Sequence, residues 1–433
     1  MFAQSIIELF EMLPILLVIA LVVNLLLRLA TTAAQPARDY TYQPRVSVLV
    51  PVYNEGANIL NTLNSIISAD WPRDKLEIIA FDDCSKDDSM MYVRQVADAH
   101  PSLVRVGSNE KNSGKHLTVL NASRHATGEI FIIIDSDCIF HEDVIKELVA
   151  CYGDERIGAV GGSVGITNIN DNVYTMSQAV TYFKSFQLGK LPQMAQGGVS
   201  CISGCLFSVR ASIYRDIEPD IHNLSWLGVK VRAGEDRFMT HIVMLRGWRT
   251  TINPKAICWT SVPNTFNVLF KQQLRWSRSA LRDTCWTLAT LPTNFRTIGV
   301  NRTLTWLMPY VLCILVTLFF FTCIPVYGIG VFWYGACIGV LFGSIHSILM
   351  ALAYNYYAPK LMPGSVKISF PLKVGLFQAW GIVSWMLHFM ALLSFDHDVW
   401  GTREKAIIPA ASNEDVDQKY PVELTNLTTE QSM

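Results

Sequence analysis

Apolar residues form long blocks near the two ends of this chain, with a mixed region between them. Residues 6–29 are apolar apart from two glutamates, one asparagine and one arginine, which is long enough to cross a bilayer about 30 Å thick. From residue 40 to about 260, β-branched runs alternate with helical patterns. Three further apolar segments follow at 303–326, 331–354 and 374–395. The pattern predicts an α/β domain inserted between transmembrane helices.

In the mixed region the pattern predicts strands and helices that alternate, with a turn after each strand. Strands are predicted at 46–52, 76–81 and 130–134, and helices at 58–69 and 115–125. Each strand ends in a polar cluster, and a single such cluster could be only a solvated turn. Ligands of open α/β sheets bind beyond the carboxyl ends of the strands, so three successive clusters predict a ligand site. The clusters are Tyr53-Asn54-Glu55, Asp82-Asp83 and Asp135-Ser136-Asp137.

The composition agrees with this two-part organisation. The 433 residues exceed a single typical core, and a content of 51% hydrophobic and 16% charged residues is too apolar for a soluble chain of this size. The ten cysteines have scattered spacings, and no C-x-x-C pair suggests zinc, as expected for a reducing compartment. The net charge of −1 excludes a strongly basic nucleic-acid binder, so we expect no nucleic-acid partner.

The first apolar segment is expected to remain as a membrane helix. Its beginning carries Glu8 and Glu11 but no Lys or Arg, whereas signal peptides start with a basic region. Small residues at 30–34 leave cleavage as the alternative. Arg28, Arg38 and Arg45 follow the segment, and positive residues favour the cytosolic side. We therefore expect an integral membrane protein, located in the plasma membrane, whose α/β domain faces the cytosol.

Two acidic pairs and one lysine offer the chemistry of group transfer. Asp135 and Asp137 carry the oxygen ligands that Mg²⁺ or Mn²⁺ prefers, although a loop of this pattern often holds no metal. Glu235 and Asp236 offer a carboxylate that can act as a general base, or they are an ordinary acidic pair at a helix start. Lys115 opens a predicted helix, where an ammonium group and the helix N-terminus favour an anion; a surface lysine is the alternative.

The run Gln272-Gln273-Leu274-Arg275-Trp276 follows these carboxylates and precedes the last apolar segments. Arg275 can hold a diphosphate through two parallel hydrogen bonds. Trp276 offers a flat apolar face on which a sugar can stack. Alone, the run could equally be an amphipathic helix with an exposed arginine. Its position after the two acidic motifs favours a binding role.

The order D-S-D, G-E-D and Q-x-x-R-W before apolar spans resembles the processive family 2 glycosyltransferases, membrane enzymes that polymerise nucleotide-sugars. The resemblance covers roughly residues 45–283, and 234–283 is most similar to rhizobial chitin-oligosaccharide synthases and class I hyaluronan synthases. It implies a GT-A-type nucleotide-sugar-binding domain, a UDP-sugar donor, a growing polysaccharide, and a divalent metal held by Asp135 and Asp137. Asp236, with Glu235 beside it, would be the base of a single displacement that inverts the anomeric carbon.

The resemblance also implies binding roles for other residues. The nucleotide would contact Tyr53, Glu55, Asp82, Asp83, Lys115, Asp135 and Arg275. The acceptor would contact Ser203, Gly204, Cys205, Gln272 and Trp276. Cys205 replaces the usual proline of the acceptor loop, and Val231 replaces a cysteine of vertebrate and viral hyaluronan synthases. These two departures leave the sugar open between UDP-GlcNAc, which should be tested first, and UDP-GlcA.

The sequence Trp400-Gly401-Thr402-Arg403 matches the W-G-T-R that closes a gating loop over UDP in hyaluronan synthases. The match implies nucleotide contacts for Trp400, Thr402 and Arg403. One span before the domain and three after it would place this motif outside the cytosol. Either the match is accidental, or one apolar segment is interfacial or bent and does not cross the membrane. The Phe370-Pro371 break and Lys373 favour the second explanation, with the last apolar segment as the interfacial or bent one.

The expected division of the chain follows from these observations. It comprises a transmembrane helix at 1–30, a GT-A domain at 40–262, interfacial helices at 263–298, transmembrane or interfacial helices at 299–400, and a polar tail without periodicity at 401–433. Two other functions stay open. One is a non-processive transferase with a lipid acceptor. The other is a membrane receptor or transporter with a degenerate sugar-binding domain, which would need no intact base or metal pair.

Overall fold

The computed structural model describes residues 37–190, 193–194, 198–226, 229–230, 234–300, 302–304, 306–307, 328–361 and 368–394. The predicted N-terminal membrane helix, most of the apolar segment at 303–326, Val231 and the polar tail lie outside these residues. Trp400, Thr402 and Arg403 also lie outside them. Their contacts with the nucleotide therefore stay a prediction.

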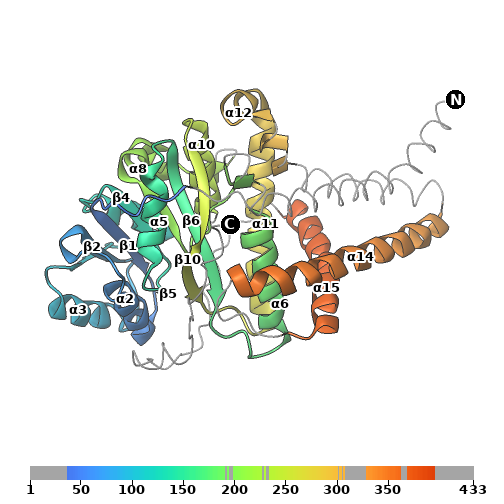
Figure 1. The fold of residues 1–433 in the computed structure, drawn as a ribbon, viewed down its shortest axis with the longest axis horizontal. Helices are drawn as coiled ribbons and strands as arrows, with labels where there is room; N and C mark the ends of the chain where they lie inside the picture. Colours follow the sequence, from blue (N-terminus) through green and yellow to red (C-terminus); the bar gives the residue numbers. More distant parts are fainter. Residues whose placement is uncertain are drawn as a thin grey trace, which may run out of the picture.

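An eight-stranded mixed sheet forms the centre of the domain (Figure 1). In spatial order its strands are β3 (Val104–Ser108), β2 (Leu76–Asp82), β1 (Val46–Val52), β4 (Ile130–Ile133), β7 (Phe207–Arg210), β6 (Ile157–Ile166), β10 (Arg249–Thr260) and β5 (Cys138–Phe140). Neighbours from β3 to β4 are parallel, as are β6 and β10. β7 is antiparallel to β4 and β6, and β5 is antiparallel to β10. A separate two-stranded sheet pairs β8 (Ser225–Trp226) with β9 (Val229–Lys230).

Helices cover both faces of the sheet, which explains why its parallel strands are continuous apolar runs. Along β1, Val46, Val48 and Val50 belong to one apolar cluster, whereas Leu49 belongs to the other. This alternation follows the two-residue period of a strand. The first cluster includes side chains of α2 (Ile59–Ile67), α3 (Ser89–Ala99) and α5 (Val144–Ala150). The second includes α4 (Lys115–Ser123), α8 (Ala211–Asp216), α9 (Glu218–His222) and α10 (Glu235–Leu245).

The strands and helices predicted for the first part of the domain are confirmed. β1, β2 and β4 coincide with the three predicted strands, and α2 and α4 with the two predicted helices. Short helical turns complete this part at η1 (Gly56–Asn58), η2 (Arg73–Lys75) and η3 (Cys151–Gly153). The predicted α/β fold is therefore correct, and the polar clusters lie at one edge of the sheet.

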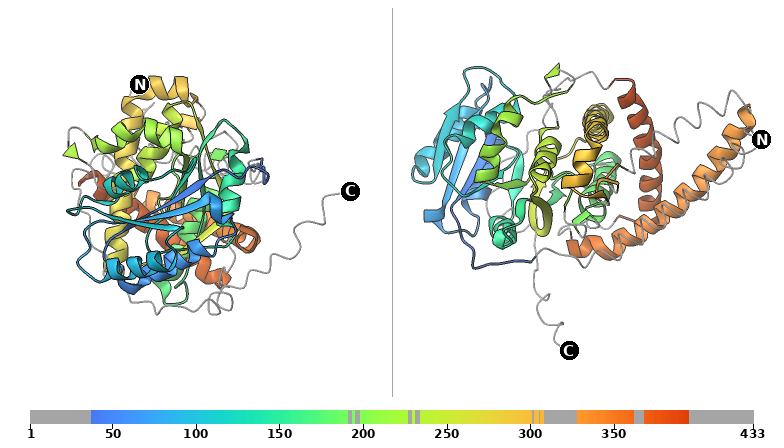
Figure 2. Two further views of the ribbon diagram at one scale, coloured as in Figure 1. Left: turned by 90° about the vertical axis from the view of Figure 1, so that its left-hand side faces the viewer. Right: turned by 90° about the horizontal axis from the view of Figure 1, so that it is seen from above.

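A second group of helices packs beside the sheet domain (Figures 1 and 2). They are α6 (Val173–Tyr182), which continues into the π-helical turn η4 (Phe183–Leu188), α11 (Phe266–Ala289), α12 (Leu291–Thr297), α14 (Ile329–Leu361) and α15 (Phe370–Leu392). α15 packs against α6, α11 and α14. The Arg278 guanidinium on α11 donates to Ser394 Oγ at 2.9 Å, just after α15 ends. The two helices are thus joined near one end.

α14 and α15 coincide with the last two predicted apolar segments, and both expose large apolar side chains. These include Trp333, Leu341 and Leu352 on α14 and Ile382 and Met386 on α15. Within the described ranges, α15 alone is both long and apolar enough to cross a membrane. The break expected at Phe370-Pro371 lies at the start of α15, where proline is tolerated because its missing N–H has no helical partner.

Candidate functional site

A cavity of about 840 Å³ opens where the carboxyl ends of β1 and β4 meet α10, α11 and α15. Most of the predicted site residues within the described ranges line it: Tyr53, Glu55, Asp83, Lys115, Asp135, Asp137, Ser203, Gly204, Cys205, Glu235, Asp236, Arg275 and Trp276. Two others, Asp82 and Gln272, are buried beside the cavity and do not line it. The fold thus gathers side chains that are up to 223 positions apart, from Tyr53 to Trp276, in one place.

Asp82 and Asp83 hold the turns at the predicted nucleotide end. Asp83 accepts hydrogen bonds from the backbone N–H groups of Ser113 at 2.7 Å and Gly114 at 2.8 Å, so it shapes the loop that leads into α4. Asp82 accepts from the hydroxyl of Ser85 at 2.5 Å. Of the pair, only Asp83 faces the cavity. A nucleotide contact by Asp82 therefore stays a prediction, since its structural role here is to close a turn.

Glu55 connects the turn after β1 with the D-S-D turn after β4. Its Oε1 accepts from the hydroxyl of Ser136 at 2.7 Å. Its backbone N–H donates to Ser89 Oγ at 2.8 Å. These bonds fix the relative positions of Tyr53, at the mouth of the cavity, and the two aspartates that flank Ser136. A preorganised polar rim of this kind suits the hydroxyl and amide groups of a nucleoside.

Lys115 lies between the two acidic pairs. Its ammonium is 2.5 Å from Asp135 Oδ1 and 3.4 Å from Glu235 Oε1. Burial alone would lower the pKa of Lys115, but the two carboxylates raise it well above its usual value. Lys115 is therefore charged, and it holds Asp135 and Glu235 in one electrostatic unit. The surface-lysine interpretation is wrong, because the side chain is only 13% exposed.

The oxygen donors at this end fit a hard divalent cation. Asp135 and Asp137 both line the cavity, and each carries a carboxylate. Mg²⁺ and Mn²⁺ are held in such sites by one or two carboxylates together with substrate phosphates. The Lys115 ammonium lies 2.5 Å from Asp135 Oδ1, so a metal ion at this end would share the Asp135 carboxylate with Lys115.

Asp236 is placed in the first turn of α10 by Gly234 and by the loop containing Gly204. Gly234 has a left-handed backbone (φ 95°), and a Cβ there would lie 2.0 Å from Ser279 Oγ. The N–H of Gly204 donates to Asp236 Oδ2 at 3.1 Å, and that of Arg237 donates to Oδ1 at 2.8 Å. Burial, followed by the charge of Glu235, raises the pKa of Asp236. A carboxylate with a raised pKa is a better proton acceptor.

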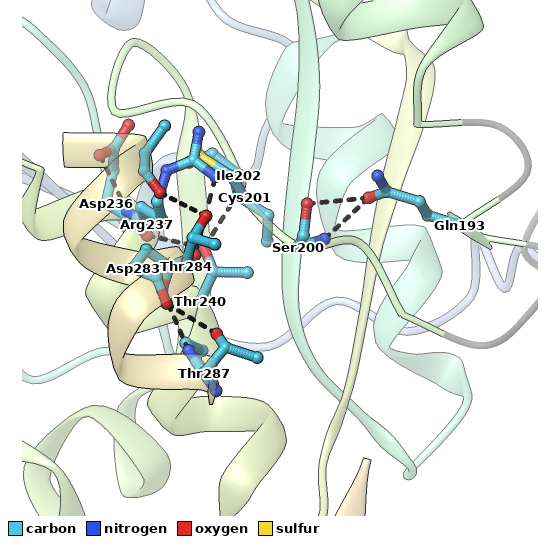
Figure 3. Close-up of polar contacts among 12 residues, drawn as sticks. Gln193, Ser200, Cys201, Ile202, Asp236, Arg237, Thr240, Asp283, Thr284 and Thr287 are labelled. Atoms are coloured by element: carbon cyan, nitrogen blue, oxygen red, sulfur yellow. Dashed lines mark hydrogen bonds and ion pairs between the residues drawn. The ribbon is translucent and has the colours of Figure 1, made fainter. Parts of the chain in front are cut away.

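Side-chain contacts of Thr240 and His241 fix the position of helix α10, and no sequence motif predicted them. Figure 3 shows Thr240, whose hydroxyl donates to the Asp236 carbonyl at 2.6 Å and accepts from the Ile202 N–H at 3.0 Å. Behind it, His241 lies 3.0 Å from Asp283 on α11 and 2.9 Å from Asn294 on α12. The three helices are thereby locked together, and the position of Asp236 depends on α11 and α12 as well as on its own turn.

The Q-x-x-R-W run is helical and forms part of α11. Arg275 and Trp276 face the cavity, and Trp276 is 36% exposed with its ring 6.2 Å from that of Tyr182. Gln273, rather than Gln272, contributes to the cavity wall. Gln272 is buried, so its predicted contact with the acceptor is not visible in this arrangement.

The resemblance to nucleotide-sugar transferases predicts that Trp276→Ala reduces transfer by about tenfold or more while nucleotide binding changes little. A sugar stacked on this indole would lose a contact worth about 1–3 kcal/mol, but the nucleotide end of the cavity would be unchanged. Calorimetry with UDP and a radiolabel transfer assay measure the two effects. Trp276→Phe is the matched variant, and it should recover part of the activity because a smaller ring still offers a flat face. Normal rates and normal product length in both variants would reduce Trp276 to a packing role.

Two parts of the cavity wall were missed by sequence reasoning. Lys190, after η4, is buried with its ammonium 4.5 Å from the Phe186 ring, and burial lowers its pKa. Trp380 and Trp385 of α15 line the far end of the cavity. No local motif marks these residues, because α6 and α15 reach the site only through tertiary packing. The spacing of aromatic residues within the last apolar segment was the one available signal.

Comparison with known proteins identifies the type of domain. Residues 44–279 match the family described as "Glycosyltransferase like family 2". An N-acetylglucosaminyltransferase of Rhizobium leguminosarum bv. viciae is 31% identical over 281 residues, which is 64% of this chain and 64% of that protein. A hyaluronan synthase of Streptococcus pyogenes is 28% identical over 58% of this chain and 60% of its own length. The chain thus spans less than two thirds of each of these curated relatives.

A solved structure supports the fold. The mannosyltransferase PcManGT from Pyrobaculum calidifontis, in complex with GDP-Man and Mn²⁺, superimposes with a TM-score of 0.56. The alignment covers 87% of this chain and 97% of that one, with 20% sequence identity. At this identity the likeness concerns the fold alone, and it agrees with the GT-A-like arrangement of the sheet.

Proposed function

The chain belongs to the glycosyltransferase-like family 2, and from this we propose that it is an integral membrane, inverting enzyme that polymerises a UDP-sugar. The product would be a β-linked polysaccharide of the hyaluronan or chitin type, and the enzyme would move it across the bilayer. UDP-GlcNAc, UDP-GlcA or both are the proposed donors. The names of the relatives support these choices, since they include N-acetylglucosaminyltransferases and a hyaluronan synthase.

One observation carries the proposal. The cavity extends from the carboxylates at the strand ends to the aromatic side chains of α15, the helix that is long and apolar enough to span a membrane. A transferase that releases a small product needs only the first part of this cavity. A polymerase needs both parts, because after each addition the growing chain must move away from the proposed general base, Asp236, while it stays bound to the protein. Trp276 and Trp380 both line the cavity, and each indole offers a flat face on which a sugar can stack.

The residues of the cavity divide the reaction between donor and acceptor. Tyr53 and the turn held by Asp83 would bind the uridine, with Arg275 on the diphosphate. Asp135 and Asp137 would hold a divalent cation, which supplies charge neutralisation to the departing UDP. Asp236 would take the proton of the acceptor hydroxyl as that oxygen attacks the anomeric carbon. One displacement inverts the configuration, so an α-linked donor gives a β-linked product.

The acceptor loop stands directly beside the proposed base. Gly204 approaches so closely that a Cβ there would lie 2.9 Å from the Lys115 ammonium and 3.6 Å from Asp236 Cβ. Cys205, the next residue, is in the cavity wall where related enzymes have a proline. The Gly204 N–H therefore reaches Asp236, and a larger residue at this position would press on Lys115 and Asp236.

The proposal is tested with the full chain purified in detergent or reconstituted in lipid. It is incubated with UDP-GlcNAc and UDP-GlcA, each radiolabelled, singly and as a pair, and the products are sized. Polymer from one donor indicates a chitin-type product, and polymer only from the pair indicates a hyaluronan-type product. A labelled glycolipid without polymer would replace the proposal with a lipid-directed transferase. Absence of turnover with sugar binding retained would favour a receptor or transporter. Asp236→Asn is the inactive control.

We expect the transfer rate to fall as the pH is lowered through the raised pKa of Asp236, because only the ionised carboxylate can accept a proton. Glu235→Gln removes the nearby negative charge that contributes to this shift. The pKa of Asp236 should then fall, and the acid limb of the kcat/KM profile should move to lower pH. An acid limb that stays in place, or moves to higher pH, would exclude Asp236 as the titrating base.

A further inference from the structure

Three thiols meet beneath the Asp135 end of the cavity, although their spacing in the sequence forms no metal-binding motif. Cys138 is the first residue of β5, Cys205 lies in the loop before β7, and Cys258 is in β10. The antiparallel pairing of β10 with β5 brings two of them to neighbouring positions. The sulfurs of Cys138 and Cys205 lie within 4.8 Å of each other, and the Cys138 thiol donates to Asp137 Oδ1 at 3.7 Å. The Cys258 thiol also donates to the Cys205 carbonyl at 3.7 Å.

One carboxylate completes this group. An oxygen of Asp135 and the sulfurs of Cys138 and Cys205 all lie within 4.8 Å of one another. We propose that these three atoms form a binding site for a thiophilic divalent cation of the Zn²⁺ class. Tetrahedral zinc lies about 2.3 Å from sulfur and about 2.0–2.2 Å from a carboxylate oxygen, which places two sulfurs and one oxygen roughly 3.5–3.8 Å apart. The three atoms lie within 4.8 Å of one another, so each pair has to approach by no more than about 1.3 Å to reach this spacing.

The position of the thiols gives the ion a route of entry. Asp135 and Cys205 line the cavity, whereas Cys138 is fully buried and does not line it. The fourth coordination position would face the cavity and take a water molecule. Binding converts two thiols to thiolates and releases their two protons to solvent. Mg²⁺ and Mn²⁺ prefer oxygen ligands. The thiols would therefore select a softer ion than the divalent cation proposed for the donor diphosphate.

The site has a consequence for catalysis that rests on the proposed function. Rotation of Asp135 toward the thiols would move its carboxylate away from the position proposed for the donor's cation. Lys115 would lose its partner at Asp135 and retain Glu235, which is 3.4 Å away. Occupation by a Zn²⁺-class ion should therefore inhibit transfer, and an excess of Mg²⁺ should relieve the inhibition poorly because Mg²⁺ does not displace thiolate-bound zinc.

Cadmium reports on the site without any need for activity. The full-length protein is titrated with Cd²⁺ in the absence of substrate, and the ultraviolet charge-transfer absorption of Cd–thiolate bonds is recorded. We expect one ion per chain, with an intensity corresponding to two thiolates. Cys138→Ala and Cys205→Ser should each weaken the affinity by about tenfold or more. Cys151→Ala is the matched control, because Cys151 is fully buried in the same apolar cluster as Cys138. Thermal unfolding monitors the fold of each variant.

The outcomes separate the site from the proposed function. No absorption, or absorption that is equal in wild type and in both ligand variants, would overturn the site whatever the activity of the protein. In the transfer assay, Zn²⁺ should inhibit wild type and Cys151→Ala alike, and inhibit Cys138→Ala about tenfold less strongly. Equal inhibition of wild type, Cys151→Ala and Cys138→Ala would overturn the inference that the thiol-bound ion and the donor's cation compete for Asp135. A protein that binds Cd²⁺ as expected but transfers no sugar would refute the proposed function and keep the site.

Discussion

Asp236→Asn is expected to lower the turnover number by a factor of about 10²–10⁴ while UDP-sugar affinity stays nearly unchanged. The amide keeps the size of the side chain and one oxygen that can accept from Gly204 or Arg237, but it cannot take a proton from the acceptor. The loss should appear in kcat and not in donor binding, because the base acts on the acceptor. Single-turnover assays and calorimetry with UDP-sugar measure the two quantities.

The fold should survive this substitution. Burial makes the charged form of Asp236 unfavourable, as its raised pKa indicates, so a neutral side chain of the same shape costs little. Asp98→Asn, an exposed carboxylate on α3, is the matched control and should leave activity unchanged. A loss of donor binding equal to the loss of turnover would instead assign Asp236 a structural role at the start of α10.

The part of the site at the strand ends was predictable because a parallel strand has a fixed direction. Once β1, β2 and β4 are read from their β-branched runs, the residues after Val52, Asp82 and Ile133 must lie at one edge of the sheet. The sequence could not distinguish the two neighbouring aspartates of the second cluster. Asp82 and Asp83 are neighbours in sequence, but a strand turns successive side chains to opposite sides, and only Asp83 reaches the cavity.

The remainder of the site depends on long-range packing, which leaves no local pattern. His241 is an unremarkable residue within α10, and it becomes a connection only because Asp283 and Asn294 approach it from other helices. Gln272 and Gln273 are equally polar, and the rotation of α11 decides which of them faces the cavity. Scattered cysteines form no metal motif in the sequence, yet the antiparallel pairing of β5 with β10 brings Cys138 and Cys258 to neighbouring strands.

The sequence predicted the positions of the apolar segments, but it did not predict which of their side chains line the cavity. A run of apolar residues predicts a helix that is covered by lipid or by protein. The side of α15 that carries Trp380 and Trp385 lines the cavity, while Ile382 and Met386 on the same helix are exposed. One helix therefore serves the site and faces outward at the same time. Such a division of faces fits a polymerase whose product leaves beside a membrane helix.

Asp137→Asn should abolish the proposed metal-dependent transfer, with a loss of at least about 10² in rate, in a protein that remains folded. The amide preserves the volume of the side chain but removes the charge that would hold the divalent ion against the donor diphosphate. Asp137 is preferred to Asp135 for this test, because Asp135 also pairs with Lys115 at 2.5 Å and its loss would leave a buried ammonium without that partner.

The measurement is a titration of Mg²⁺ and of Mn²⁺ at fixed UDP-sugar, with initial rates recorded for wild type and variant. Asp171→Asn, an exposed carboxylate that accepts from Asn168 at 3.1 Å, is the control and should keep the wild-type metal response. In Asp137→Asn the half-saturating metal concentration should rise steeply or become unmeasurable, since one of two carboxylate ligands is gone. Activity within about threefold of wild type, with the same metal dependence, would remove Asp137 from the metal site and leave charge neutralisation to Lys115 and Arg275.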